Sequence, residues 1–380
     1  MKETLSTYFA SLEDPRSKRN QRHDFMTLIG TSLLATLSGI HSFSGIQDFV
    51  EMHMDDLKKY FDFRHGLPSH DTYQRLWDAL SPTQFQACFM DFIKSLETVA
   101  SEVLSIDGKT IRNSGKEKAL HIVSAWCHNN KLVFGQEKVD AKSNEIKAIP
   151  KLLDLLELDQ KIITIDAMGC QRDICQKIID KNGDYLISLK GNQGTLHDDV
   201  GLYLKDPSNH ELINENNDKG HGRIEQRVAA VAHNIDWLQE VHSWPGLKSI
   251  GQITATVWRK GKETTETRFY ISSLALTAQQ LNEVARAHWG IENQLHWVLD
   301  VTFNEDKACI RNVNAAENLD ILRKWALSVL VKLKEKPEQS IKSVMRKNAM
   351  SFKYLIKSVK KILRACPSKF KQYSLIKFNR

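Results

Sequence analysis

The spacing of apolar residues changes character near residue 100 of the chain. Before that point, apolar side chains recur every three or four positions, the period of a helix with one buried face. Ser81-Pro82-Thr83-Gln84 supplies a capping Ser, a Pro at the first helical position and a Gln at the third. Ser44 is a second candidate cap, and Gly39 suits a helix end. We therefore expect helices over residues 25–38, 44–60, 71–80 and 82–96.

After residue 100 the apolar runs become short and rich in β-branched residues. Three such runs, 103–111, 120–127 and 132–139, are separated by turn residues and predict an antiparallel meander. A helix ending near residue 156, a strand over 161–166, a helix over 173–181 and a strand over 184–189 follow. The order β-β-β-α-β-α-β predicts an α/β fold with a mixed sheet and a ribonuclease-H-like core. In that core the first and fourth strands are neighbours.

The rest of the chain divides into three further stretches. Residues 198–275 are polar and then β-like, with a predicted hairpin around Lys260-Gly261-Lys262, and we interpret them as a β-rich insertion. Thr277 can cap a long helix to about residue 299, and more helices continue to residue 334. We predict an N-terminal helical domain over 1–98, an α/β domain over 99–335 and a basic helical tail over 336–380. The N-terminal helices fit either a helix-turn-helix DNA reader or a structural bundle.

The positive charge of the chain is concentrated at its C-terminal end. The formal net charge is +7, yet 12 of the 53 Lys and Arg residues and none of the 46 Asp and Glu residues lie between Ile341 and Arg380. The remainder is therefore net acidic. Residues 353–364 mix Lys with aliphatic side chains at helical spacing, which suits a cationic helix facing phosphates. A solvated helix face and a membrane-surface helix are the alternatives.

Composition and cysteine use indicate a cytoplasmic, globular protein. Hydrophobic residues make up 41% of the chain and charged residues 26%. The uncharged stretch between Asp24 and Asp48 carries several Thr, Ser and Gly residues, so a buried helix is a better interpretation than a membrane span. The six cysteines lie in apolar or helical surroundings, and we expect reduced thiols. Cys170 and Cys175 have no second pair that would complete a zinc site.

Two similar tetrads end predicted strands with an acid. They are Ser105-Ile106-Asp107-Gly108 and Thr164-Ile165-Asp166-Ala167. A buried carboxylate needs a counter-charge, because an uncompensated one costs several kcal/mol. Neighbouring strands lie about 4.8 Å apart, so acids on the first and fourth strands can share a cation site. We therefore expect Asp107 and Asp166 to bind divalent metal together.

A site for two divalent cations usually needs a third acid. His288, Glu292 and His296 stand four residues apart on a predicted helix, and Glu292 is the candidate. The alternatives are a solvated glutamate paired with a neighbouring histidine, and a zinc site on this stripe. Other acids compete for the role: Glu145, Asp300, Glu305 and Asp306.

Several stretches of the chain resemble one known family. Taken in order, residues 105–112, 121–125, 142–146, 165–171, 190–194, 221–223 and 288–306 resemble the H-repeat-associated (ISAs-type) insertion-sequence transposases, a bacterial branch of the DDE transposases. The match runs from about residue 5 to residue 363. Asp107 and Asp166 stand where that family has its first two acids, and Glu292 where it has its third. The wider class places Tyr, Arg and Lys around the third acid, where this chain has Ala285, His288 and Leu299.

The resemblance implies DNA cleavage and strand transfer at the ends of an insertion sequence. It implies Asp107, Asp166 and Glu292 as catalytic ligands of divalent metal, with magnesium expected and manganese as the alternative. The partners would be double-stranded DNA, as terminal inverted repeats and target, and a second copy of the chain on that DNA. Residues at the rim of the site are candidates for DNA contact: Lys109, Arg112, Lys190, Asn192 and His288. A metal-dependent nuclease that does not join DNA and a non-catalytic DNA-binding protein are the alternatives.

Overall fold

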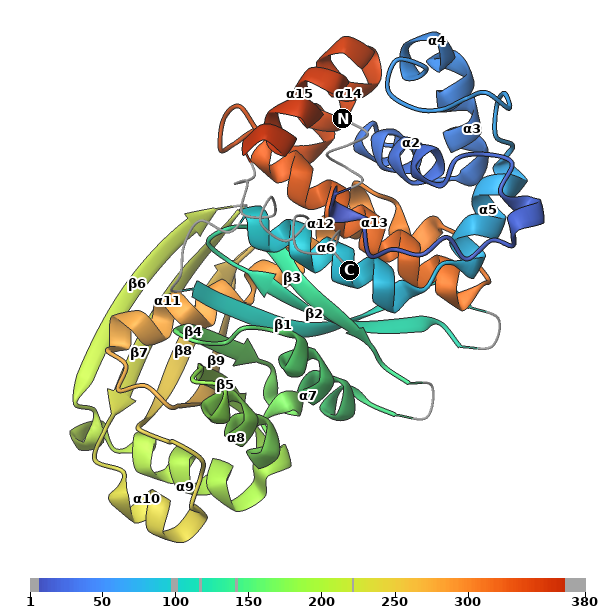
Figure 1. The fold of residues 1–380 in the computed structure, drawn as a ribbon. Coiled ribbons are helices and arrows are strands. Elements are labelled where there is room, and N and C mark those ends of the chain that lie inside the picture. Colours follow the sequence, from blue (N-terminus) through green and yellow to red (C-terminus); the bar gives the residue numbers. More distant parts are fainter. Residues whose placement is uncertain (1–6, 97–101, 116–117, 141–142, 221, 366–380) are drawn as a thin grey trace.

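The computed structural model describes residues 7–96, 102–115, 118–140, 143–220 and 222–365. Figure 1 shows a helical part, built from both ends of the chain, packed against a part built on a long twisted sheet. Within the described residues no helix has both the length and the apolar character needed to cross a bilayer. Cys88, Cys127, Cys170, Cys175 and Cys309 are free thiols, and all but Cys309 are buried.

The N-terminal helices follow the predicted pattern, and the predicted cap Ser81 accepts the N–H of Gln84 at 3.4 Å. After the short η1 (Lys18–Asn20), the helices are α2 (Phe25–Leu37), α3 (Phe43–Met52), α4 (Met54–Leu57), α5 (His70–Ala79) and α6 (Pro82–Leu96). Asp24 caps α2 by accepting the N–H of Thr27 at 2.9 Å. Ser42, and not Ser44, caps α3 by accepting the N–H of Gly45. The helix predicted over 44–60 is interrupted at His53, which separates α3 from α4.

In the described residues one nine-stranded sheet has the order β3-β2-β1-β4-β5-β9-β8-β7-β6. Its first five strands are β1 (Glu102–Ile111), β2 (Leu120–Cys127), β3 (Leu132–Lys138), β4 (Lys161–Ile165) and β5 (Asp184–Leu189). β1 and β2 are antiparallel, whereas β1 and β4 are parallel, with Ser105 opposite Thr164. The prediction that the first and fourth strands are neighbours is confirmed, so the two tetrads lie side by side.

Four later strands extend the same sheet. They are β6 (Leu212–Gly220), β7 (Arg223–Ala232), β8 (Ser249–Arg259) and β9 (Lys262–Ser272). The predicted hairpin is confirmed: Arg259 pairs with Lys262 across a turn in which Lys260 and Gly261 have positive φ, as a type I′ turn requires. β6 was not predicted, because almost every side chain on it is exposed and no apolar alternation marks it. The insertion joins the sheet through antiparallel pairing of β9 with β5.

Helices cover the sheet and connect it to the helical part. The helices between the strands are α7 (Glu145–Leu155), α8 (Arg172–Asp180), α9 (Gly194–Lys205) and α10 (Asp236–His242), with short turns η2 (Ala167–Gly169), η3 (Gly191–Gln193) and η4 (Pro207–Asn209). α11 (Ala278–His288) packs against β1, β4 and β7. Figure 1 shows α11 crossing the sheet between the insertion and the central strands.

The buried helix α13 (Val313–Lys332) holds the two parts together. It packs against α2, α5 and α6 on one side and against β2 and β3 on the other. Trp325 of α13 is 1% exposed and stacks among Phe9, Phe85, Phe89 and Phe92. The chain continues into α14 (Ile341–Met350) and α15 (Phe352–Ala365). The predicted tail therefore begins as two helices, and its last residues, 366–380, lie outside the described range.

Candidate active site

The two tetrad acids lie directly after the parallel pairing of β1 with β4, which ends at Ile106 opposite Ile165. Asp107 is on β1, opposite Ser124 of β2, and Asp166 follows the last residue of β4. Asp166 caps η2, where its Oδ1 accepts the N–H groups of Met168 at 3.0 Å and Gly169 at 3.3 Å. These two amides orient the carboxylate.

The hydroxyl residues of the tetrads connect the strands to α11. Thr164 Oγ1 donates to Ser105 Oγ at 3.1 Å and lies 3.0 Å from Nδ1 of His288. Ser105 Oγ in turn donates to the carbonyl oxygen of Ala287 at 3.4 Å. Both hydroxyls are buried. The repeated hydroxyl thus fixes the end of the helix that precedes Glu292, a role that the sequence pattern did not reveal.

Glu292 lies on a π-helical segment, and not on the uninterrupted helix predicted over 277–299. α11 ends at His288, η5 (Ile291–His296) is a π-helix, and α12 (Trp297–Val301) completes the run. Such π-segments are rare and often occur at functional sites. A Cβ atom on Gly290 would come within 2.9 Å of His128 Nδ1, so a glycine permits the close approach to β2. The predicted apolar stripe is buried at Ile291 and Leu295.

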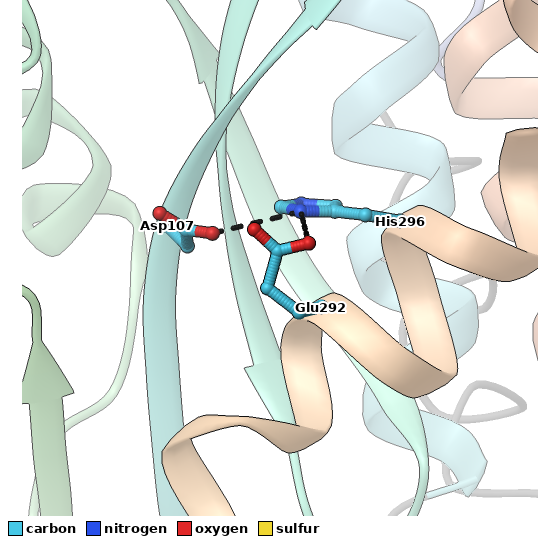
Figure 2. A group of neighbouring side chains, drawn as sticks. All are labelled: Asp107, Glu292 and His296. Atoms are coloured by element: carbon cyan, nitrogen blue, oxygen red, sulfur yellow. Dashed lines mark ion pairs between the residues drawn. The ribbon is translucent and has the colours of Figure 1, made fainter. Parts of the chain in front are cut away.

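Figure 2 shows Glu292 and His296 of η5 pointing toward Asp107 of β1. His296 Nδ1 lies 3.6 Å from Asp107 Oδ2 and 3.6 Å from Glu292 Oε2. One ligand atom from each of the three residues can be chosen so that all lie within 4.8 Å of one another. The His296 side chain is 6% exposed, and its Nε2 atom has no partner among the described residues. Two carboxylates and an imidazole form a donor set that suits a divalent cation.

A cavity of about 230 Å³ opens at these acids. Asp107, Asp166 and Glu292 all line it, so the structure brings the three predicted acids to one place. The other polar and aromatic groups on its wall are Thr164, Ser188, Lys190, Arg268, Tyr270, His288 and Trp289. The side chain of the third acid, Glu292, is 53% exposed, whereas that of Asp107 is 20% exposed.

Burial and neighbouring acids perturb the titration of the site. Burial, and then the Glu292 carboxylate, raises the pKa of Asp107 from 3.8 to about 7. A hydrogen bond with His296 lowers the pKa of Glu292. Burial lowers the pKa of His288, so its imidazole favours the neutral form. Without metal, Asp107 therefore titrates around neutral pH and is protonated below it, and a bound cation would favour the carboxylate.

The raised pKa of Asp107 predicts that the contribution of this residue to the stability of the metal-free protein falls as pH rises. Between the unfolded value of 3.8 and the folded value of about 7, the folded state holds a proton that the unfolded chain has released. The folded state is thus favoured at the acidic end of this window, and the advantage is lost as pH approaches 7. In thermal unfolding in EDTA, the Tm of Asp107→Asn relative to that of the wild-type protein should therefore increase as pH rises across this window. Equal pH dependence in both proteins would contradict this titration.

Glu145 is the competing acid nearest to Asp107. The charge of Glu145 contributes to the raised pKa of Asp107. Its Oε1 lies 2.7 Å from Nε2 of His121, whose Nδ1 lies 2.7 Å from Thr110 Oγ1. The side chains of Glu145 and His121 lie against Gly108. A Cβ atom added to Gly108 would lie 2.2 Å from Glu145 Oε1 and 2.7 Å from His121 Nε2. The glycine of the first tetrad therefore makes room for this pair beside the site.

The other three competing acids surround Lys109 instead of the cavity. Lys109 Nζ lies 2.8 Å from Asp300, 3.0 Å from Glu305 and 3.4 Å from Asp306, and its side chain is 11% exposed. Burial alone would lower the pKa of Lys109, but the carboxylates, Glu305 first, outweigh it and raise that pKa. This geometry does not support the prediction that Lys109 contacts DNA, because three carboxylates already neutralise its charge.

The remaining predicted DNA contacts have different surroundings. Lys190 is exposed and lines the cavity at the end of β5. The side chain of Arg112 is 80% exposed, and its Nε lies 3.5 Å from Asp306. Asn192 is exposed, and one N–H of its amide donates to the carbonyl oxygen of Ala167, the residue after Asp166, at 2.7 Å. His288 is mostly buried and faces the cavity.

Arg268 is a cation of the cavity that the sequence did not single out. It comes from β9 of the insertion, and its guanidinium lies 5.0 Å from the ring centroid of Trp289. Two hydrogen bonds of 2.9 Å join it to Glu266. Only the sheet topology brings Arg268 to the site, so no local motif could reveal it.

The wider class has a Tyr and a Lys at two positions where this chain has Ala285 and Leu299. Ala285 lines the cavity, and Leu299 is buried in the core.

Comparisons with known proteins cover both parts of the chain. Residues 100–329 match the family described as Transposase DDE domain, and residues 6–93 match the one described as DDE_Tnp_1-associated. The chain is 39% identical to the H repeat-associated putative transposase YhhI of Escherichia coli (strain K12), over 92% of this chain and 96% of that protein. It is 37% identical to the putative transposase YncI of Escherichia coli O157:H7, over 96% of this chain and 95% of that protein. It is also 39% identical to the putative protein YbfL of Escherichia coli (strain K12), over 92% of this chain and 96% of that protein.

Proposed function

The chain belongs to the family of transposases with a DDE domain, and we propose that it cuts DNA at the ends of a bacterial insertion sequence and joins those ends to target DNA. The observation that carries the proposal is the convergence of Asp107, Asp166 and Glu292 on one cavity. They come from two strands and a π-helix that are distant in the sequence. The reaction is an in-line phosphoryl transfer without a covalent enzyme intermediate.

The sheet order supports a ribonuclease-H-like catalytic core. The strands β3-β2-β1-β4-β5 are adjacent in that order, with β2 antiparallel to β1 and both β4 and β5 parallel to it. The two strand acids lie on the central pair. We assign residues 99–335 to the catalytic domain, residues 198–275 to its insertion, and residues 1–98 and 336–380 to flanking DNA-binding parts.

The donor set of the cavity fits a divalent metal, which this family normally uses. We propose magnesium, with manganese as the alternative, held by Asp107, Asp166 and Glu292. His296 is a further candidate ligand, because its Nδ1 is directed between two of the carboxylates. When bound, divalent metal activates the attacking oxygen and stabilises the leaving oxygen.

The residues around the acids have supporting roles in this proposal. The amides of Met168 and Gly169 hold the Asp166 carboxylate in one orientation. His288 stands where the wider class has an arginine, but burial favours its neutral form, so it does not supply a lasting positive charge. Arg268 and Lys190 supply positive charge on the cavity wall, where they can contact the DNA phosphates.

The test of this function is an assay with labelled duplexes that carry the element ends. With Mg²⁺ we expect 3′-end cleavage and, when target DNA is added, joined products that migrate as larger species. Cleavage without joined products would favour a metal-dependent nuclease. Binding of the ends without cleavage in Mg²⁺ or Mn²⁺ would favour a non-catalytic DNA-binding protein. A duplex of scrambled end sequence serves as the control, since a transposase should leave it uncut.

A further inference from the structure

A second large hollow lies in the helical part, away from the acids. Its volume is about 1060 Å³, and it is formed by residues 56–60 at the end of α4, by the segment after α13 and by α15. Figure 1 shows α15 at the outer edge of the helical part. We call this hollow the lysine groove, after the residues that dominate its lining: Lys59, Lys353, Lys357, Lys360 and Lys361.

α15 presents one face to the core and another to the groove. Leu355, Ile356, Val359 and Ile362 are buried, and the helix packs against α13 and α14. Lys353, Lys357 and Lys361 are exposed and follow one another at intervals of four residues. On an α-helix this spacing places the three ammonium groups along one stripe. The groove therefore has a row of positive charges on one wall.

The acids that line the groove make their ion pairs with lysines outside this row, although the charge of Lys361 contributes to the lowered pKa of Glu335. Asp56 lies 2.6 Å from Lys59, and Glu335 lies 2.7 Å from Lys347. Tyr354 also donates its hydroxyl to Glu335, at 3.0 Å. Among the described residues, no carboxylate lies within 4.0 Å of Lys353, Lys357, Lys360 or Lys361.

One further lysine is positioned by an aromatic ring. The ammonium of Lys360 lies 4.8 Å from the ring centroid of Tyr60, which belongs to the opposite wall. The contact connects the N-terminal helices to the C-terminal helix across the groove. The two ends of the chain thus make one composite surface, whose net positive charge favours an anionic partner.

We propose that the lysine groove binds the phosphate backbone of duplex DNA, independently of base sequence. The choice of DNA as the polyanion rests on the proposed function. A bilayer surface fits less well, because interfacial helices bury an apolar face in lipid and that of α15 is already buried in the protein. Lysines contact phosphate as point charges, which gives affinity and positioning without reading bases.

Fluorescence anisotropy with a labelled duplex, in EDTA and over a range of salt concentrations, tests the groove. Lys357→Gln/Lys361→Gln should weaken binding. It should also make the plot of log affinity against log salt less steep by about 1.8, which is about 0.9 for each phosphate that the protein no longer neutralises. The matched control is Lys205→Gln/Lys248→Gln, which removes two exposed lysines from the distant α9 and the loop before β8. The control should keep the wild-type slope. Element-end and scrambled duplexes should show the same weakening.

Each contrary result has a defined meaning. Equal slopes for the groove variant and the control would overturn the proposal. If the groove variant lost binding to vesicles containing phosphatidylserine but bound DNA as the wild-type protein does, the groove would be a membrane-binding surface. That result would also overturn the proposal. The binding measurement is made in EDTA and requires no cleavage. Failure of the cleavage assay would therefore leave it intact, and failure here would not touch the catalytic proposal.

Discussion

Asp107→Asn and Asp166→Asn should each lower the rate of metal-dependent end cleavage by at least about a hundredfold. Loss of groups that only orient metal ligands typically costs about 10- to 100-fold in affinity or activity, so loss of a ligand should cost at least as much. Asn keeps the shape of the side chain and, at position 166, the oxygen that accepts the amides of Met168 and Gly169. The folded structure should therefore survive, which circular dichroism and thermal unfolding without metal can verify.

Asp173→Asn is the matched control for this pair. Asp173 is exposed in the first turn of α8, so the same chemical change there should leave cleavage unchanged. His296→Asn tests whether the His296 imidazole is a metal ligand in addition to the carboxylates. If His296 is a ligand, Mn²⁺ affinity measured by electron paramagnetic resonance without DNA should fall together with cleavage. Wild-type rates for Asp107→Asn would remove the candidate site altogether.

Glu305→Gln should destabilise the protein by about 3–5 kcal/mol, the usual cost of removing one partner from a buried ion pair. Glu305 is completely buried. Its Oε2 lies 3.0 Å from Lys109 Nζ, and its Oε1 lies 3.4 Å from Arg323 Nη1. The amide of Gln cannot accept from both cations, because one of its two oxygens has become an NH₂ group. Urea unfolding of the metal-free protein gives the free energy of unfolding.

Arg112→Gln provides the comparison for the buried cluster. Arg112 pairs with Asp306 at the rim of the same cluster, at 3.5 Å, and its side chain is 80% exposed. Exposed pairs contribute about 0–1 kcal/mol, so this change should be close to neutral. If both variants had similar free energies of unfolding, Glu305 would not be a structural centre of the fold. Lys109 is two residues after Asp107 on β1, so loss of Glu305 should also loosen the strand that carries the acid.

Much of the site could be predicted because its parts follow local rules. Asp107 and Asp166 each follow a short apolar run, and the order of elements places those runs on adjacent strands, as β1 and β4 confirm. Asp166 follows the end of β4, whereas β1 continues past Asp107 to Ile111. Helix starts were predictable where a cap and a Pro coincide, as at Pro82. These features depend on residues close to one another in the chain, which is where sequence patterns are informative.

The features that could not be predicted depend on long-range packing. The π-helical segment at Glu292 has the same apolar spacing as an α-helix, so the pattern predicted an uninterrupted one. Lys109 looked like a rim cation, but Asp300, Glu305 and Asp306 meet it only after the chain folds. Arg268 reaches the cavity because β9 pairs with β5. No local signal marks any of these contacts.

The position of α13 has a consequence for shortened copies of the chain. Trp325 packs among aromatic rings from the N-terminal segment, while the same helix lies against β2 and β3. A gene product that lacks the first hundred residues would place that indole and the neighbouring leucines in water. A truncated copy would therefore be prone to aggregate and to be degraded, even with all three acids intact.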